Sequence, residues 1–145
     1  MQVDRHGFHG LLHSANLVEA ELRRQLAPLG IQTRQALVLD AMDRMGPVSQ
    51  SVLAAEFGVT SASMSTMTDR LLAAGYITRT TSPTSRRQNE LELTPRGRAL
   101  LDGIAQAWTA VDRILTKALG DDAASFFAQA QRLRNALEGK IPGRN

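Results

Sequence analysis

Small hydroxylated side chains and one arginine gather in a short stretch near the middle of the chain. They are Ser61, Ser63, Ser65, Thr66 and Arg70. Such side chains add little helix propensity, but they let a helix approach another surface closely and exchange hydrogen bonds with it. Close approach with hydrogen bonding is how a helix distinguishes base edges in the major groove of DNA. The alternative is a surface helix, rich in serine and threonine, that has no target.

Three arginines follow this stretch, with no acidic residue between Asp69 and Glu90. They are Arg79, Arg86 and Arg87. Arginine suits bidentate contacts with phosphate and is attracted into narrow minor grooves. A run of positive charge on a hairpin is usually only a solvated face. Beside a helix that contacts DNA, the same run predicts phosphate and minor-groove contacts.

A row of histidines near the start of the chain is the third candidate site. His6, His9 and His13 are spaced i, i+3 and i+7, which places them on one face of a predicted helix. Neutral imidazoles at this spacing can share a metal ion. The chain has no cysteine and no clustered carboxylate to complete such a site, so no metal is predicted. A metal-responsive regulator that uses this face stays open as an alternative.

A helix-turn-helix is predicted to position the hydroxylated stretch. Ser49 and Thr60 are the expected N-caps of its two helices, and Gly58 between them can take the left-handed conformation that ends a helix. Two helices joined by a short glycine-containing turn are typical of this motif. The second helix has an apolar face made of Met64, Met67 and Leu71. Burial of that face leaves the hydroxylated side chains outside, with Thr68 and Arg70 at the edges.

A two-stranded wing is predicted after the second helix. Residues 76–80 and 89–94 alternate between polar and apolar types, and a Ser/Pro/Thr/Arg segment separates them. This pattern indicates a β-hairpin with its tip in that segment. Thr94 and Pro95 then predict an N-cap followed by the first position of another helix.

The remaining segments predict amphipathic helices. Apolar residues at spacings of three and four indicate helices over about 8–27, from a Thr33 cap to Met45, from Thr94 for about six turns, and onward from an Asp121 or Asp122 cap. Inward-facing residues are expected in the last helix, namely Phe126, Phe127, Ala130, Leu133 and Leu137. The terminal helices carry more apolar surface than the small central core can cover. A homodimer through these helices is therefore predicted, with a monomeric helical bundle as the alternative.

Length and composition narrow the class of protein. The chain has 145 residues, 43% of them hydrophobic and 21% charged, which is typical of one globular domain. It has no apolar run long enough for a membrane span and no recognisable signal peptide, so a cytoplasmic location is expected. A phosphate-binding glycine loop, a G-x-S-x-G motif, an H-E-x-x-H motif and a cysteine nucleophile are all missing, so no enzyme is predicted.

Several motifs, taken in order, resemble the MarR (multiple antibiotic resistance regulator) family of bacterial winged-helix transcription factors. They are Asp69-Arg70-Leu71, Gly75-Tyr76-Ile77-Thr78-Arg79, Arg86-Arg87 and Leu93-Thr94-Pro95-Arg96-Gly97. The resemblance covers nearly the whole chain. It implies a mainly α fold with a dimerisation helix over 1–30, a winged helix-turn-helix lobe over 31–94 and dimerisation helices over 95–145.

The resemblance also implies a function. Members of the family bind double-stranded DNA as homodimers, and a repressor of an inverted-repeat operator, released by a small effector, is expected here. The helix over 60–74 would enter the major groove and the wing tip the minor groove. The residues implied to face DNA are Ser61, Ser63, Ser65, Thr66, Arg70, Arg79, Arg86 and Arg87. The residues implied to line an aromatic-effector cavity are His9, His13, Asn16 and Trp108. No cofactor is implied.

One feature departs from the family pattern. Acidic residues are usual in the family wing, whereas this chain has Ser82 and Ser85 at two such positions. A wing without those acids is expected to be more positive and more mobile at its tip. A winged-helix domain that docks onto a protein partner is the remaining alternative, and the arginines of the wing favour phosphate over an apolar partner.

Overall fold

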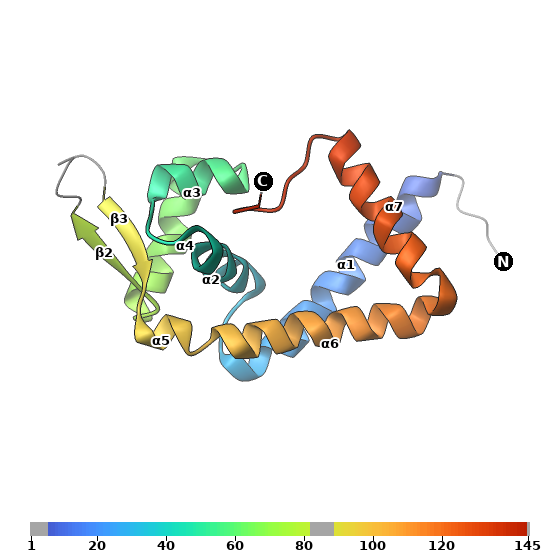
Figure 1. Ribbon diagram of the computed structural model, residues 1–145, viewed down its shortest axis with the longest axis horizontal. Coiled ribbons are helices and arrows are strands. Elements are labelled where there is room, and N and C mark those ends of the chain that lie inside the picture. Colours follow the sequence, from blue (N-terminus) through green and yellow to red (C-terminus); the bar gives the residue numbers. More distant parts are fainter. Residues whose placement is uncertain (1–5, 82–88, 145) are drawn as a thin grey trace.

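The computed structural model describes residues 6–81 and 89–144 (Figure 1). The predicted wing-tip residues Arg86 and Arg87, and the departures at Ser82 and Ser85, lie outside the described residues. The helices are α1 (Gly7–Leu26), η1 (Ala27–Leu29), α2 (Thr33–Met45), α3 (Gln50–Phe57), α4 (Ser61–Ala73), α5 (Pro95–Arg98), α6 (Leu101–Leu119), η2 (Gly120–Asp122) and α7 (Ala123–Ala136). The strands are β1 (Val48–Ser49), β2 (Ile77–Thr81) and β3 (Asn89–Leu93).

A winged helix-turn-helix lobe forms one end of the molecule and long helices form the other (Figure 1). In the lobe, α2, α3 and α4 pack with an antiparallel sheet of strand order β1-β3-β2 around one apolar core. Strands β2 and β3 are the predicted wing, paired in the register Ile77 with Leu93 and Arg79 with Leu91. The sequence did not predict β1, which is two residues long and is defined only by its pairing with β3.

Three of the predicted helix starts are confirmed. The side-chain oxygen of Ser49 accepts a hydrogen bond from the Val52 N–H at 3.3 Å. Thr60 accepts one in the same way at the start of α4, and Thr94 does so at the start of α5. Each bond satisfies one of the N–H groups that a helix leaves without a partner in its first turn. Gly58 ends α3 in the left-handed conformation, with φ 62°, which sets the sharp turn into α4.

The predicted cap at Thr33 is wrong by one residue. Gln32 is the N-cap of α2, and its backbone N–H donates a hydrogen bond of 2.8 Å to Oε1 of Gln35. Glutamine at the third helical position can close back onto the cap residue, and that interaction moves the helix start. Thr33 is instead the first residue of α2, and its hydroxyl is buried without a hydrogen-bond partner among the described residues.

The helix predicted to run unbroken from Thr94 is divided. A short helix, α5, is followed by a turn at Ala99 and Leu100 before α6 begins. Gly97 packs so tightly on the wing that an added Cβ would collide with the carbonyl oxygen of Tyr76. Thr94 holds the same corner, because its hydroxyl donates a hydrogen bond of 2.6 Å to the Gly75 carbonyl. This packing fixes α5 beside the sheet, so α6 departs after a turn.

Helices α1 and α7 expose much of their apolar surface, whereas α6 buries Ile104 and Val111. Helix α6 runs the length of the long end, α1 crosses it and α7 folds back from its far end (Figure 1). The inward-facing prediction for α7 is wrong for the single chain, because Phe126 and Leu133 are 44% and 43% exposed and Leu137 is 73% exposed. Asp122 precedes α7 without capping it through its side chain. None of the described helices combines the length and apolar character required to cross a bilayer.

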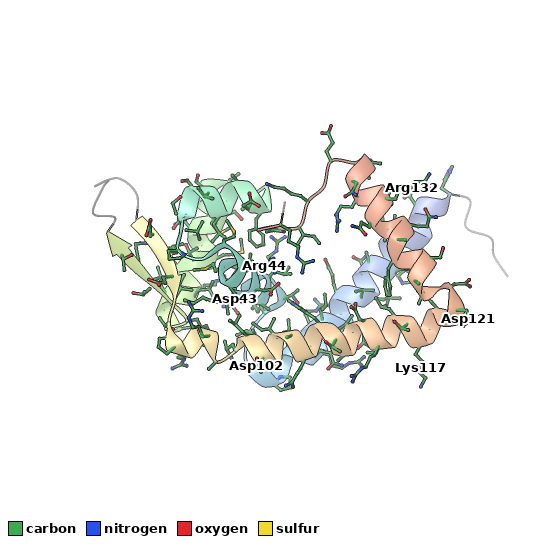
Figure 2. The ribbon with its side chains drawn as sticks, in the orientation of Figure 1. Asp43, Arg44, Asp102, Lys117, Asp121 and Arg132 are labelled. Atoms are coloured by element: carbon green, nitrogen blue, oxygen red, sulfur yellow. The ribbon has the colours of Figure 1, made fainter. Side chains whose placement is uncertain are left out.

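The segment after α7 returns to the winged-helix lobe (Figure 1). Lys140 Nζ lies 2.9 Å from Glu56 Oε1 on α3, and the Gly143 N–H donates to the other oxygen of the same carboxylate at 3.1 Å. Arg44 on α2 donates to the Pro142 carbonyl at 2.6 Å. Figure 2 shows Arg44 and its neighbour Asp43 on α2, near the centre of the molecule. The returning segment thus ties the end of the chain to α2 and α3.

Candidate nucleic-acid interface

The outer face of α4 carries small polar side chains over a buried apolar face. Met64, Met67 and Leu71 are buried as predicted. The hydroxylated candidates are exposed at Ser61, Ser63 and Thr66 and half-buried at Ser65, and Arg70 is also exposed. From Ser61 to Thr66 the exposed side chains are small, so this part of α4 can approach another surface closely.

The hydroxyl of Thr66 is partly occupied within the helix. It donates to the Ala62 carbonyl one turn earlier, at 3.2 Å. Such back-bonding leaves the lone pairs of the hydroxyl oxygen free to accept a hydrogen bond from outside. Thr66 is therefore suited to meet a donor, whereas Ser61 and Ser63 remain free to rotate and to donate as well.

Thr68 does not lie at the edge of the exposed face, as the sequence suggested, but is fully buried. Its hydroxyl lies 3.0 Å from the Met64 carbonyl and 3.1 Å from Oε1 of Gln50, the first residue of α3. The Gln50 oxygen also accepts a hydrogen bond of 3.2 Å from the Arg79 guanidinium on β2. One glutamine side chain therefore connects the two helices of the motif with the wing.

This connection fixes the direction of the Arg79 side chain. Residues directly opposite each other in antiparallel strands share a face of the sheet, and Arg79 lies opposite the buried Leu91. Arg79 consequently leaves the wing on the side of the helices, although it remains exposed. The sequence identified Arg79 but not Gln50. Gln50 precedes α4 and Arg79 follows it, and no local sequence pattern predicts that the two side chains lie together.

The charges of this surface are not neutralised from within the described residues. Neither Arg70 nor Arg79 takes part in any ion pair that the described residues form. The hydrogen bond from Arg79 to the neutral amide of Gln50 does not neutralise the guanidinium, so its full charge can act on an anion outside the protein. The outer face of α4 and the adjoining part of β2 are accordingly suited to a negatively charged backbone.

A further arginine, not singled out from the sequence, lies near the base of the wing. The Arg96 guanidinium lies 5.3 Å from the ring centroid of Tyr76, within the range of a cation–π contact. Arg98 on the same short helix lies 3.8 Å from Asp43 on α2. These contacts hold α5 against the lobe, and Arg96 is exposed at the surface.

The three histidines predicted to share one face lie at the start of α1. His6, His9 and His13 are exposed, and among residues 6–81 and 89–144 no three histidine, aspartate or glutamate side chains are grouped closely enough to hold a metal ion. His9 instead contacts Phe8 edge to face, with ring centroids 4.3 Å apart. The proposed effector residues His9, His13 and Asn16 are exposed, whereas Trp108 packs against the core.

The family model for the MarR family matches residues 29–88, the span that contains α2, α3, α4 and the wing. Over this span, the chain is similar to the MarR family. Its mainly helical fold with a small antiparallel sheet is that of the winged-helix regulators of this family. A comparison with curated proteins gives no match.

Several solved MarR-family structures share the fold over nearly the whole chain. A mutant MarR from E. coli complexed with operator DNA has a TM-score of 0.76 and 25% identity over 86% of this chain and 90% of its own. The transcriptional repressor CouR, bound to a 23-mer DNA duplex, has a TM-score of 0.81 and 24% identity over 92% and 98%. Bordetella bronchiseptica BpsR, whose DNA binding is regulated by 6-hydroxynicotinic acid, has a TM-score of 0.79 and 18% identity over 93% and 96%.

Proposed function

We propose that this protein is a DNA-binding transcription regulator of the MarR family that acts as a repressor, binds an inverted-repeat operator as a homodimer, and is released by a small-molecule effector. The observation that carries the DNA-binding proposal is the outer face of α4. It exposes hydroxyl groups and Arg70, while the methionine and leucine side chains of the inner face are buried. Ser61, Ser63, Ser65, Thr66 and Arg70 would contact the major groove, and Arg79, Arg86 and Arg87 would contact phosphates and the minor groove.

The exposed apolar side chains of the terminal helices support the homodimer. Phe8, Leu11, Leu12 and Leu17 of α1 and Ile114 of α6 are exposed in the single chain, together with the apolar residues of α7. Apolar surface of this extent is characteristic of a protein–protein interface. A two-fold dimer presents two copies of α4 to DNA, so the half-sites should be inverted repeats about one helical turn apart.

Binding of the protein to duplex DNA at several salt concentrations tests the assignment of residues. Ser63→Ala should change base preference and leave the salt dependence intact, because its hydroxyl is proposed to meet a base edge. Arg79→Gln should weaken cognate and scrambled duplexes alike and reduce the slope of log affinity against log salt by about one unit. Arg24→Gln on α1 is the matched charge control. Unchanged slopes and affinities for Arg79→Gln would show that Arg79 does not contact DNA.

Release by a small-molecule effector can be tested separately from DNA binding. The DNA binding of BpsR, which shares this fold, is regulated by 6-hydroxynicotinic acid. By the family resemblance, the residues proposed to line an effector cavity in this chain are His9, His13, Asn16 and Trp108. Salicylate is a suitable first probe, with release of a fluorescent duplex as the measurement. If salicylate neither releases DNA nor raises the melting temperature, the aromatic-effector proposal fails while DNA binding stands.

A further inference from the structure

The returning segment, residues 138–144, ends in a reverse turn. The Arg144 N–H donates a hydrogen bond of 3.1 Å to the Ile141 carbonyl, which makes Pro142 and Gly143 the two central residues. Gly143 has a φ of 74°. Proline at the first central position and glycine with a positive φ at the second are typical of a type II turn. The sequence Ile-Pro-Gly-Arg therefore favours this turn through local interactions alone.

Two charged side chains of the winged-helix lobe hold the central peptide group of that turn. Arg44 of α2 donates a hydrogen bond of 2.6 Å to the Pro142 carbonyl. On the other side, Oε2 of Glu56 of α3 accepts the Gly143 N–H at 3.1 Å. The carbonyl and N–H of a peptide group point in opposite directions, so one peptide group can bind a cation and an anion at once. Arg44 and Glu56 are placed to do both.

The surface around this peptide group also suits the neighbouring residues. The ammonium of Lys140 lies 2.9 Å from the other oxygen of the Glu56 carboxylate. Gly143 packs on α2, where an added Cβ would lie 2.9 Å from Cγ of Met45 and 3.4 Å from the Ala41 carbonyl oxygen. A larger residue there would be strained in its backbone and crowded by α2. The surface therefore fits a Lys-x-Pro-Gly turn.

Arg44 is held in place for this contact. Its Nη1 lies 2.5 Å from the carboxylate of Asp40, one turn earlier on α2, and its side chain is only 23% exposed. A guanidinium anchored on one edge loses little conformational freedom when its other edge binds a carbonyl. Asp40 therefore orients Arg44 toward the turn.

The end of α7 directs the returning segment toward the lobe (Figure 1). The Gly139 N–H donates a hydrogen bond of 2.8 Å to the Arg134 carbonyl, and the Glu138 N–H donates one of 3.1 Å to the Asn135 carbonyl. Glu138 is in the left-handed conformation, with a φ of 60°. These are the two hydrogen bonds of a Schellman motif, which ends a helix and turns the chain away from its axis.

The returning segment is a third connection between the lobe and the long helices. The link from α1 to α2 and the link from α5 to α6 both lie beside the start of α6, where Leu29 of η1 packs on Gly103. The returning segment meets the lobe elsewhere, at α3 and the end of α2 (Figure 1). Two connections that lie close together allow the lobe to rotate about them, and a third at a distance removes that freedom.

We propose that Arg44, Met45 and Glu56 form a binding site for the Lys-Ile-Pro-Gly turn of residues 140–143, and that this contact sets the half-site spacing that the protein accepts. The bound turn fixes the orientation of the lobe and therefore the direction of α4. One inserted base pair shifts a half-site by about 3.4 Å and rotates it by about 34°, which a fixed lobe cannot follow. The effect on DNA rests on the proposed function, whereas binding of the turn does not.

Hydrogen exchange of the Gly143 amide, followed by NMR in the full chain, tests the binding site. In the wild type this amide should exchange at least roughly tenfold more slowly than in a free Lys-Ile-Pro-Gly-Arg-Asn peptide. Glu56→Ala removes both the acceptor and the charge, so it should abolish this protection. Glu56→Gln keeps an acceptor oxygen and should abolish only part of it. Lys117→Gln, which removes the other lysine of the chain, should leave the exchange rate unchanged.

Duplexes of different half-site spacing test the consequence for DNA. The wild type first selects a duplex from a random-sequence library, and one base pair is then inserted or removed between its half-sites. This change should weaken binding of the wild type by roughly tenfold or more. Gly143→Ala releases the turn without altering any side chain of the lobe. Its loss of affinity on the same change should be at least roughly threefold smaller, because a freed lobe can follow the half-site.

Several outcomes overturn the inference. Exchange of the wild-type Gly143 amide at the free-peptide rate would remove the binding site, as would full protection in Glu56→Ala. Equal spacing dependence for the wild type and Gly143→Ala would remove the control of spacing. Melting temperatures show whether each variant folds, and Lys140→Gln, outside every helix, repeats the exchange test if Glu56→Ala does not fold. If the wild type selects no duplex but protects Gly143, the proposed function fails and the binding site stands.

Discussion

Helices α4 and α7 have nearly the same length, 13 and 14 residues, and both are amphipathic. They differ in which of their two faces is buried within the chain. Helix α4 buries four residues within the lobe, whereas α7 buries only Ala123. In α4 the apolar face is satisfied inside the chain and the polar face is left to meet a partner. In α7 the apolar face itself, with Phe126 and Leu133, is left exposed. Helix α4 is thus suited to bind a polar target, and α7 is suited to pack against a protein surface.

The largest effect that separates the two helices is expected from truncating their apolar side chains. Leu71→Ala in α4 should lower the free energy of unfolding by roughly 2–5 kcal/mol, because it leaves a cavity in a fully buried site. Leu133→Ala in α7 removes a side chain that the single chain leaves 43% exposed, so it should instead weaken the dimer. Urea unfolding at several protein concentrations distinguishes the two. A concentration-independent loss for Leu133→Ala would show that α7 does not pack on a second copy.

A smaller effect is expected where α4 is tied to the wing. Thr68→Val keeps the shape of the buried side chain but removes the hydroxyl that contacts Gln50. It should cost roughly 1–2 kcal/mol of stability, measured by urea unfolding. Because Gln50 also holds Arg79, Gln50→Leu should weaken DNA binding as well. Unaltered DNA binding by Gln50→Leu would mean that Arg79 needs no such support.

The smallest effect concerns the returning segment, and it depends on pH. The hydrogen bonds from Lys140 and from the Gly143 backbone lower the pKa of Glu56 below its usual 4.5. A lowered pKa in the folded state stabilises the fold above the usual pKa, and this contribution is lost as the pH falls through the folded pKa. The wild type should therefore exceed Glu56→Gln in stability at neutral pH, and the difference should vanish in acid. A difference that persists at low pH would contradict the ion pair.

Much of this arrangement followed from local sequence signals. The caps at Ser49, Thr60 and Thr94, the turn at Gly58 and the alternation of the wing all act through neighbouring residues, so a single sequence contains them. The motifs that resemble the MarR family indicated the order of the elements, including the lobe that contains α4. The start of α2 was misplaced by one residue because Gln32, not Thr33, is the N-cap, with Gln35 accepting a hydrogen bond from its backbone N–H.

What the sequence did not contain depends on contacts between distant residues. The buried state of Thr68 needs Gln50 on another helix, and the break after α5 needs the close approach of Gly97 to Tyr76. A groove lined by residues of α1, α2, α3 and α4, among them Arg23 and Met67, also depends on the tertiary fold, because no periodic pattern relates these residues. The apolar face of α7 was predicted to face inward, but it is exposed in the single chain. Periodicity identifies an apolar stripe without showing whether the same chain or a second copy covers it.

The contact between Lys140 and Glu56 has a chemical consequence. Its amine and carboxylate lie 2.9 Å apart and 84 positions apart along the chain, so a water-soluble carbodiimide should condense them into an amide without any spacer. Such a bond would close a covalent loop from residue 56 to residue 140 within the polypeptide. On a denaturing gel a loop closed within one chain runs as a single subunit, whereas exchange of the segment between two copies would give a species of twice the mass. One coupling reaction therefore shows whether Lys140 contacts Glu56 of its own chain or of a second copy.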